Sequence, residues 1–241
     1  MCTVTWIQDG DRYSLYCNRD ELRTRKPSQP PHHHHGGGTR FLAPTDGEAG
    51  GTWIAVNEHG LSLCLLNDYR WTVEDRANAL TSRGHLVRDL IQAADLEALG
   101  QLWSRADLHR FRPFNILVLT PRRDACLFSW NGEEATLGQD TVRPPLCSSS
   151  FDDLGAAKSR MNLLGDFSAK TEMEPRKRHL RFHQSHQPER GPYSVCMHRP
   201  DAVTVSFTLV EVDPAGVSMA YAPGAPCSTP LEHLVTLDRV S

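Results

Sequence analysis

The sequence lacks any long apolar run. No stretch approaches the roughly 18 consecutive apolar residues that a transmembrane helix needs, and polar residues from Gln8 to Arg12 interrupt the segment where a signal peptide would have its hydrophobic region. An excess of basic charge is missing too, because 26 Lys and Arg residues stand against 29 Asp and Glu residues. We therefore expect a cytoplasmic protein with no integral membrane segment and no nucleic-acid partner.

Closely spaced cysteine pairs are also absent. The seven cysteines form no CxxC pair and follow no regular spacing, which argues against a disulfide framework and a zinc knuckle. We expect most of them to be buried thiols in strands. Two groups of histidines offer metal ligands, His32–His35 and the set of His179, His183 and His186. The first lies in a polar tract and the second in a basic stretch, so we interpret both as solvent-exposed surface and predict no metal site.

The chain does contain short runs of alternating or β-branched residues that are joined by turn residues. These runs predict hairpins over 2–20, 51–67, 114–138 and 202–222. Apolar residues at three- and four-residue spacings predict one or two helices over 82–105 and another over 152–164. We expect long loops at 23–50 and, after a helix end, at 168–192. Over the 241 residues, this pattern predicts a single α+β domain in which helices cover antiparallel sheets.

The residue after the initiator methionine is Cys2, and this position gives it a particular chemistry. Removal of Met1 would leave one residue with both a thiol and a free α-amine. A thiol reacts as the thiolate, and an α-amine, with a pKa of about 7.7 to 8.0, can take up the thiol proton and later deliver it to a leaving amine. The sequence therefore offers a nucleophile and a base on one residue, although a cysteine at this position has no such role in most proteins.

The first expected hairpin brings further polar residues to Cys2. An antiparallel return strand places Arg19 and Asp20 beside it, and only one of the two can share its face, because successive side chains of a regular strand point to opposite sides. We expect this residue to be Asp20. Asn67, at the end of another strand, can donate a hydrogen bond to a developing oxyanion. Each of these residues also fits an ordinary turn or strand end, so the pattern alone leaves a purely structural role open.

Four motifs occur in order along the first part of the chain: "MCTVTW", "CNRDE", "GGTWIAVNEHGLSLCLLN" and "SRGHLVRDL". In this combination the chain resembles the NRDE family, which includes the transport and Golgi organization protein 2 proteins and is named after the tetrad from Asn18 to Glu21. The resemblance implies a four-layer αββα sandwich similar to the amino-terminal nucleophile (Ntn) hydrolases. It also invites comparison with the cholylglycine hydrolase and penicillin V acylase group.

That comparison implies roles for individual residues. The expected catalytic residues are Cys2 as the nucleophile, Asp20 as the carboxylate that holds the amine, Arg19 as the cation near the thiol, Asn67 as the oxyanion donor and Arg199 as the late arginine. The expected substrate contacts are Asn18 and Trp53. The chain departs from the acylases in two places: their arginine precedes the aspartate by three residues rather than one, and their late asparagine falls near Ser148–Ser150, where this chain has only serines.

The resemblance thus favours a hydrolase that cleaves a C–N amide bond of a small molecule through an acyl-thioester at Cys2, with no cofactor. An alternative of another class is a non-catalytic carrier of haem or of a lipid-like ligand, because eukaryotic members of the family are associated with haem and lipid homeostasis. A third alternative is a pseudoenzyme that keeps only the fold. Loss of turnover in Cys2→Ala with intact folding would distinguish the first from the other two.

Overall fold

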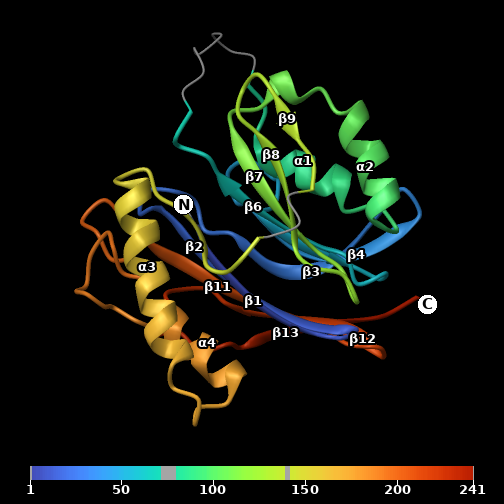
Figure 1. Ribbon diagram of the computed structural model, residues 1–241. Coiled ribbons are helices and arrows are strands. Elements are labelled where there is room, and N and C mark those ends of the chain that lie inside the picture. The colour runs from blue at the N-terminus through green and yellow to red at the C-terminus, as the bar shows by residue number, and fades with distance from the viewer. Residues whose placement is uncertain (1, 72–79, 139–141, 241) are drawn as a thin grey trace.

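The computed structural model describes residues 2–71, 80–138 and 142–240 (Figure 1). Its strands form two sheets in which the paired strands are antiparallel. The first sheet has the order β10 (Leu146–Ser148), β1 (Cys2–Asp9), β2 (Arg12–Leu22), β11 (Ala202–Val212), β12 (Gly216–Ala222) and β13 (His233–Asp238). The second has the order β3 (Gln29–Gly36), β4 (Thr39–Thr45), β5 (Ile54–Asn57), β6 (Ser62–Asn67), β7 (Phe114–Leu119), β8 (Cys126–Trp130) and β9 (Ala135–Thr136).

Helices cover the outer face of each sheet. Figure 1 shows α1 (Arg83–Leu90) and α2 (Leu96–Arg105) beside the second sheet, and α3 (Asp153–Ser168) and α4 (Pro175–His183) beside the first. A short 3₁₀ helix, η1 (Leu108–Arg110), follows α2. The layers therefore run helix, sheet, sheet, helix, which confirms the α+β class and the αββα sandwich expected from the sequence.

The main hydrophobic core lies between the two sheets. It takes alternate residues of each strand, for example Val4 and Trp6 of β1, which are packed with Ile54 and Val56 of β5. A second core lies between the other face of the second sheet and the helices α1 and α2. Alternation along the strands thus assigns each side chain either to the space between the sheets or to a helical layer.

The helices begin at residues that suit a helix start. Asp95 and Asp152 precede α2 and α3, and each accepts a hydrogen bond from the backbone N–H three residues later. Glu174 accepts two such bonds at the start of α4, whose first residue is Pro175. These local signals position α3 and α4, which support the first sheet at the end that holds Cys2.

The segment 23–50 is mostly strand, which corrects the loop expected there. It contains β3 and β4, which are joined by a turn at Gly37 and Gly38, both with positive φ. Prolines in a strand interior remove ladder hydrogen bonds, and the sequence contains Pro30 and Pro31. They are tolerated because β3 is the outermost strand of its sheet and its register shifts between Gln29 and His32.

The other expected loop, 168–192, contains the helix α4. The strands β10 and β13 were not expected either, and both form the edges of the first sheet. The remaining hairpins and helices agree with the sequence analysis. Among the described residues, no helix combines the length and the apolar character that a membrane span needs.

The cysteines lie largely as expected, but the histidines of the basic stretch do not. None of the seven cysteines is in a disulfide, and five of them lie in strands, as expected for most of them. His32, His33 and His35 are exposed on β3, as expected. His183, however, is completely buried against the first sheet, where it contacts Thr5 at 2.9 Å and stacks on Tyr16. The basic helix therefore uses its histidines for packing and not as a solvated face.

Candidate active site

Cys2 is the first residue of β1 and lies between two neighbouring strands. Its Cα pairs with that of Arg19 in β2 on one side and with that of Ser148 in β10 on the other. The backbone nitrogen of Cys2 donates a hydrogen bond of 3.1 Å to Oγ of Ser148. The side chain is 6% exposed and belongs to the core between the sheets. Strand pairing thus fixes the position of both the nitrogen and the thiol.

A cavity of about 450 Å³ lies at this end of the first sheet. Five of the side chains that the sequence analysis singled out line it: Cys2, Arg19, Asp20, Trp53 and Asn67. A larger cavity of about 910 Å³ lies elsewhere, among the turns near Asp11 and Arg122, and none of the expected site residues lines it. The cavity at Cys2 is therefore the candidate active site.

Arg19 shares the face of the Cys2 side chain, which corrects the expectation that Asp20 would do so. The Arg19 guanidinium lies over the ring of Trp53, 4.1 Å from its centroid, and Trp53 belongs to the same core as Cys2. Its Nη2 forms a buried ion pair with Asp46. Arg19 thus directs its charge at a carboxylate and an aromatic face rather than at the thiol.

Asp46 is held as an anion by a second arginine. Arg25 donates hydrogen bonds of 3.0 and 2.9 Å to the two oxygens of Asp46. Burial raises the pKa of Asp46, but the hydrogen bonds from Arg25 and from the backbone of Ala49 outweigh it and lower that pKa to about 2. The charge of Arg19 is therefore matched by a permanent negative charge at neutral pH.

Asp20 faces the helical side of the first sheet. Its Oδ1 accepts a hydrogen bond of 2.6 Å from Oγ1 of Thr204, and its Oδ2 lies 3.9 Å from Nη2 of Arg160 in α3. Burial raises the pKa of the Asp20 carboxyl, although Arg160 and Thr204 act against it. The register of β11 shifts between Thr204 and Ser206, opposite Asp20 and Arg19. This β-bulge bends the ladder where the cavity reaches both side chains.

The Cys2 thiol is not acidified by its surroundings. A hydrogen bond with the Cys17 side chain, followed by burial, raises the pKa of the Cys2 thiol well above its ordinary value. Cys17 in turn lies 3.8 Å from Cys64 between their sulfur atoms. The sequence suggested a cation that favours the thiolate, and the structure corrects this, because the hydrogen-bond partner of the Cys2 sulfur is another thiol, that of Cys17. The resting thiol is protonated at neutral pH.

Asn67 and Arg83 supply hydrogen-bond donors on the side of the cavity opposite β2. Asn67 donates through Nδ2 to the hydroxyl of Tyr69 at 2.8 Å. Arg83 begins α1, within the "SRGHLVRDL" motif, and donates to the carbonyl of Pro113 at 2.9 Å. Within residues 2–71, 80–138 and 142–240, no carboxylate forms an ion pair with Arg83, although burial lowers its pKa. This cation was not expected from the sequence.

The start of α1 comes very close to Thr52, which together with Trp53 directly precedes β5. A Cβ atom added to Gly84 would lie 2.7 Å from the backbone nitrogen of Thr52, so only glycine fits there. The same nitrogen donates a hydrogen bond of 3.1 Å to the carbonyl of Gly84. This contact brings Arg83 to the cavity.

The structure places Asn18 and Arg199 away from this cavity. Asn18 is completely buried and donates to the carbonyls of His183 and Val195, both at 2.9 Å. Arg199 forms a bidentate ion pair with Asp201 at 3.0 and 2.6 Å. Neither lines the cavity. Asn18 therefore ties the helical layer to β2, and the structure gives Arg199 no contact with the candidate site.

The fold defines a class of protein: two antiparallel sheets between helical layers, as in the Ntn hydrolases. Penicillin V acylase from Agrobacterium tumefaciens superposes with a TM-score of 0.51 at 11% identity, covering 99% of this chain and 86% of that one. The N-acylethanolamine-hydrolyzing acid amidase orthologue from Caenorhabditis elegans gives 0.56 at 14%, covering 86% and 92%. A variant of conjugated bile acid hydrolase from Clostridium perfringens gives 0.57 at 8%, covering 98% and 92%. At such low identity these similarities establish the fold.

The sequence itself assigns the chain to a family. A profile described as Transport and Golgi organisation 2 matches residues 1–154, and the chain belongs to that family. No curated protein matches the sequence. The matched region contains Cys2, the tetrad from Asn18 to Glu21, Asn67 and Ser148, whereas Arg199 lies beyond it.

Proposed function

We propose that the protein hydrolyses a C–N amide bond of a small molecule, with Cys2 as the nucleophile. The observation that carries this proposal is the shared cavity at the start of β1, which is lined by the thiol of Cys2, the carboxylate of Asp20 and the amide of Asn67. An Ntn-hydrolase-like fold supports it, because three acylases or amidases share that fold.

The reaction begins with removal of Met1, which converts the nitrogen of Cys2 into an α-amine. The amine takes the thiol proton, and the thiolate sulfur attacks the substrate carbonyl. Asn67 donates to the oxyanion that forms. The amine then delivers its proton to the leaving nitrogen, the C–N bond breaks, and water hydrolyses the acyl-thioester. A high thiol pKa fits this order, because the thiolate forms only when the amine accepts the proton within the complex.

Asp20 and Ser148 would orient that amine. Ser148 already accepts a hydrogen bond from the Cys2 nitrogen, and a protonated amine at the same position would carry a charge that favours a carboxylate in the same cavity. Asp20 holds its position through Thr204 and Arg160. Ser148 thus lies in the segment where the late asparagine of the acylases is expected, and it would contact the amine there.

The substrate of this reaction would carry a negative group. Arg19 and Arg25 share two carboxylates, Asp46 and Glu21, so these four residues form a neutral set. Arg83 faces the same cavity without a carboxylate partner among the described residues, and its burial strengthens electrostatic attraction. A carboxylate or a similar anion at one end of the amide would bind there.

The first test is the intact mass of untagged protein, combined with a screen of small anionic amides. We expect loss of Met1 and release of amine from at least one substrate, with no release by Cys2→Ala. Retention of Met1 in active protein would exclude the mechanism, because the nitrogen of Cys2 would then be an amide without basicity.

The second candidate is a non-catalytic carrier of haem or of a lipid-like ligand. The raised pKa of Cys2 favours it, because a protonated thiol among other thiols is also what an inert core contains. A carrier would show a haem absorption band or a co-purified lipid, and both would persist in Cys2→Ala. The two functions therefore differ in the response to one substitution.

A further inference from the structure

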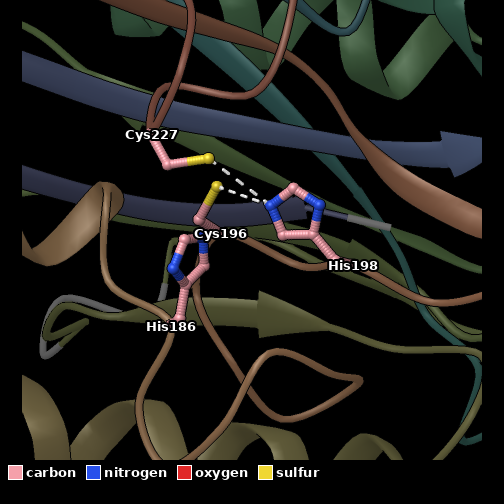
Figure 2. Close-up of side chains that lie close together, drawn as sticks. All are labelled: His186, Cys196, His198 and Cys227. Carbon is pink, nitrogen blue, oxygen red and sulfur yellow. Dashed lines mark hydrogen bonds between the residues drawn. The ribbon is translucent and has the colours of Figure 1, made fainter.

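Four metal-ligating side chains converge on the helical side of the first sheet, outside the cavity at Cys2 (Figure 2). His186 follows the end of α4, Cys196 and His198 precede β11, and Cys227 lies in the connection between β12 and β13. One ligand atom from each residue lies within 4.8 Å of all the others. Three separate segments of the chain therefore meet at one point.

The distances match the edges of a tetrahedral metal site. Sγ of Cys196 is 3.6 Å and Sγ of Cys227 is 3.5 Å from the same atom, Nε2 of His198. Zinc bonds of about 2.3 Å to sulfur and 2.0–2.1 Å to nitrogen, at tetrahedral angles, put S and N about 3.6 Å apart. One imidazole nitrogen has a single in-plane hydrogen or lone pair, so it cannot bond well to two thiols at once. A central ion would use both sulfurs and the nitrogen.

A second observation, the unpaired nitrogen of His186, also points to a metal ion at this cluster. Nε2 of His186 is buried and has no hydrogen-bond partner among the described residues. Buried polar atoms in folded proteins are almost always paired. In Figure 2 the His186 ring lies beside Cys196, and Cys227 lies on the other side of Cys196. Cys196 itself is completely buried. The unpaired nitrogen thus belongs to the same cluster that holds the two thiols.

We propose that His186, Cys196, His198 and Cys227 bind one Zn²⁺ ion in a closed, tetrahedral site. Two sulfurs and two imidazoles are a ligand set that zinc prefers in structural sites. Binding releases two thiol protons to solvent, and the two thiolates then neutralise the two charges of the ion. The basic character of the stretch, which argued against a metal in the sequence, does not repel the neutral site. Arg190 instead directs Nη2 at the sulfur of Cys227, at 3.9 Å, where it would stabilise the thiolate.

The ion would hold in place a hydrogen-bond chain that leads to Asp20. Met197, between the two ligands Cys196 and His198, donates its backbone N–H to Oγ1 of Thr204 at 2.8 Å. Thr204 in turn donates to Asp20 at 2.6 Å. Zinc binding itself does not depend on the proposed hydrolysis, and its site lies beyond the residues that the family profile matches.

The test measures metal content in untagged protein that has been incubated with zinc and dialysed against a weak chelator. We expect close to one zinc ion per chain in the wild type and at least a fivefold loss in Cys227→Ser and in His186→Ala. Two matched controls should keep the zinc. Cys147→Ser removes an equally half-buried thiol elsewhere, and the combined variant H32A/H33A/H35A removes the exposed histidines of β3.

A second measurement on the wild-type protein does not depend on how the variants fold. Cobalt added to the metal-free protein should give the intense thiolate charge-transfer absorption and the visible bands of tetrahedral coordination. Zinc should protect Cys196 and Cys227, but not Cys147, from alkylation. The proposal is overturned if the wild type retains no zinc and shows no such cobalt spectrum, if peptide mapping finds a Cys196–Cys227 disulfide in fresh protein, or if only H32A/H33A/H35A loses the metal.

Discussion

Cys2 and Arg19 are directly opposite each other in the β1–β2 pairing, yet the Arg19 guanidinium is bonded to Asp46 and lies over Trp53. A cation that is already paired does little for a neighbouring thiol. The sulfur of Cys2 instead has a hydrogen bond with the Cys17 thiol, and the pKa of Cys2 is raised. In the proposed mechanism, the reactivity of Cys2 therefore depends on its amine and not on a resting thiolate.

This relationship predicts the pH dependence of Cys2 alkylation. Because the thiol pKa lies above the ordinary value of 9.0, the thiolate fraction at neutral pH is smaller than that of a free cysteine. We expect iodoacetamide to label Cys2 in folded protein more slowly than in urea-unfolded protein, with a rate still rising beyond about pH 9. Faster labelling of the folded protein near neutral pH, measured by peptide mapping, would contradict the raised pKa.

Substitution of the nucleophile should remove turnover without removing the fold. For an amide that the protein cleaves, we expect Cys2→Ala to lower kcat by at least about a thousandfold, the range seen when other enzymes lose their nucleophile. Asp20→Asn should also lower kcat, because the amine loses its charged partner. Cys126→Ala is the control, since Cys126 lies in the second sheet, away from the cavity. Equal rates for Cys2→Ala and the wild type would exclude Cys2 as the nucleophile.

Substrate charge should be recognised through Arg83. We expect Arg83→Gln to raise KM for an anionic amide about 10- to 150-fold, since a charge-assisted hydrogen bond contributes about 1.5–3 kcal/mol. The kcat value and the KM for an uncharged analogue should change little. Arg122→Gln, an exposed arginine far from the cavity, serves as the control. An equal rise in KM for both amides would show that Arg83 has a structural role instead.

The buried pair of Arg160 and Asp20 should be important for stability. Arg160→Met removes the cation that lies 3.9 Å from the buried Asp20 carboxylate, and breaking a buried pair in this way costs about 3–5 kcal/mol. Arg176→Met removes an exposed pair with Glu211, for which about 0–1 kcal/mol is expected. Urea unfolding followed by circular dichroism measures both free energies, and similar losses in the two variants would contradict the assignment.

Histidine burial predicts a loss of stability in mild acid. Burial lowers the pKa of His179 to about 4. In the unfolded chain this histidine binds a proton near pH 6.5, whereas in the folded chain it does so only near pH 4. This contribution is complete above about pH 6.5 and is lost as the pH falls toward 4, by on the order of 2 kcal/mol at pH 5. His179→Gln should weaken this dependence, measured as Tm against pH. His233→Gln, at an exposed position, should leave it unchanged.

The parts of the fold that the sequence predicted are those with a simple period. The hairpin of β1 and β2 alternates regularly, and α2 combines helical spacing with the N-cap Asp95. The strand β3 was missed because two prolines and four histidines give no strand signal, and only its place at a sheet edge makes it possible. Edge position also explains the omission of β13, whose residues are largely exposed and so need no alternation.

The candidate site was predictable as far as strand pairing determines it. The register of β1 and β2 brings Cys2 beside Arg19, the strand-end position indicated Asn67, and the resemblance supplied Trp53. What the sequence could not show depends on contacts between distant segments. Arg83 reaches the cavity because the start of α1 packs on Thr52, just before β5. Asn18 lies away from the cavity because its side chain bonds to the backbone of the buried His183.

The hydrogen bond between Cys2 and Ser148 also has a consequence for the order of events during synthesis. The two residues are 146 positions apart, so at ordinary synthesis rates β10 leaves the ribosome roughly 7 to 30 s after β1. Until then the Cys2 nitrogen has no neighbour from β10, and the bond before it is open to an aminopeptidase. Once β10 pairs with β1, the hydrogen bond to Ser148 holds the Cys2 nitrogen in the sheet. Maturation of the nucleophile would thus compete with folding, and a chain that folds before it is trimmed would keep a complete cavity without an amine.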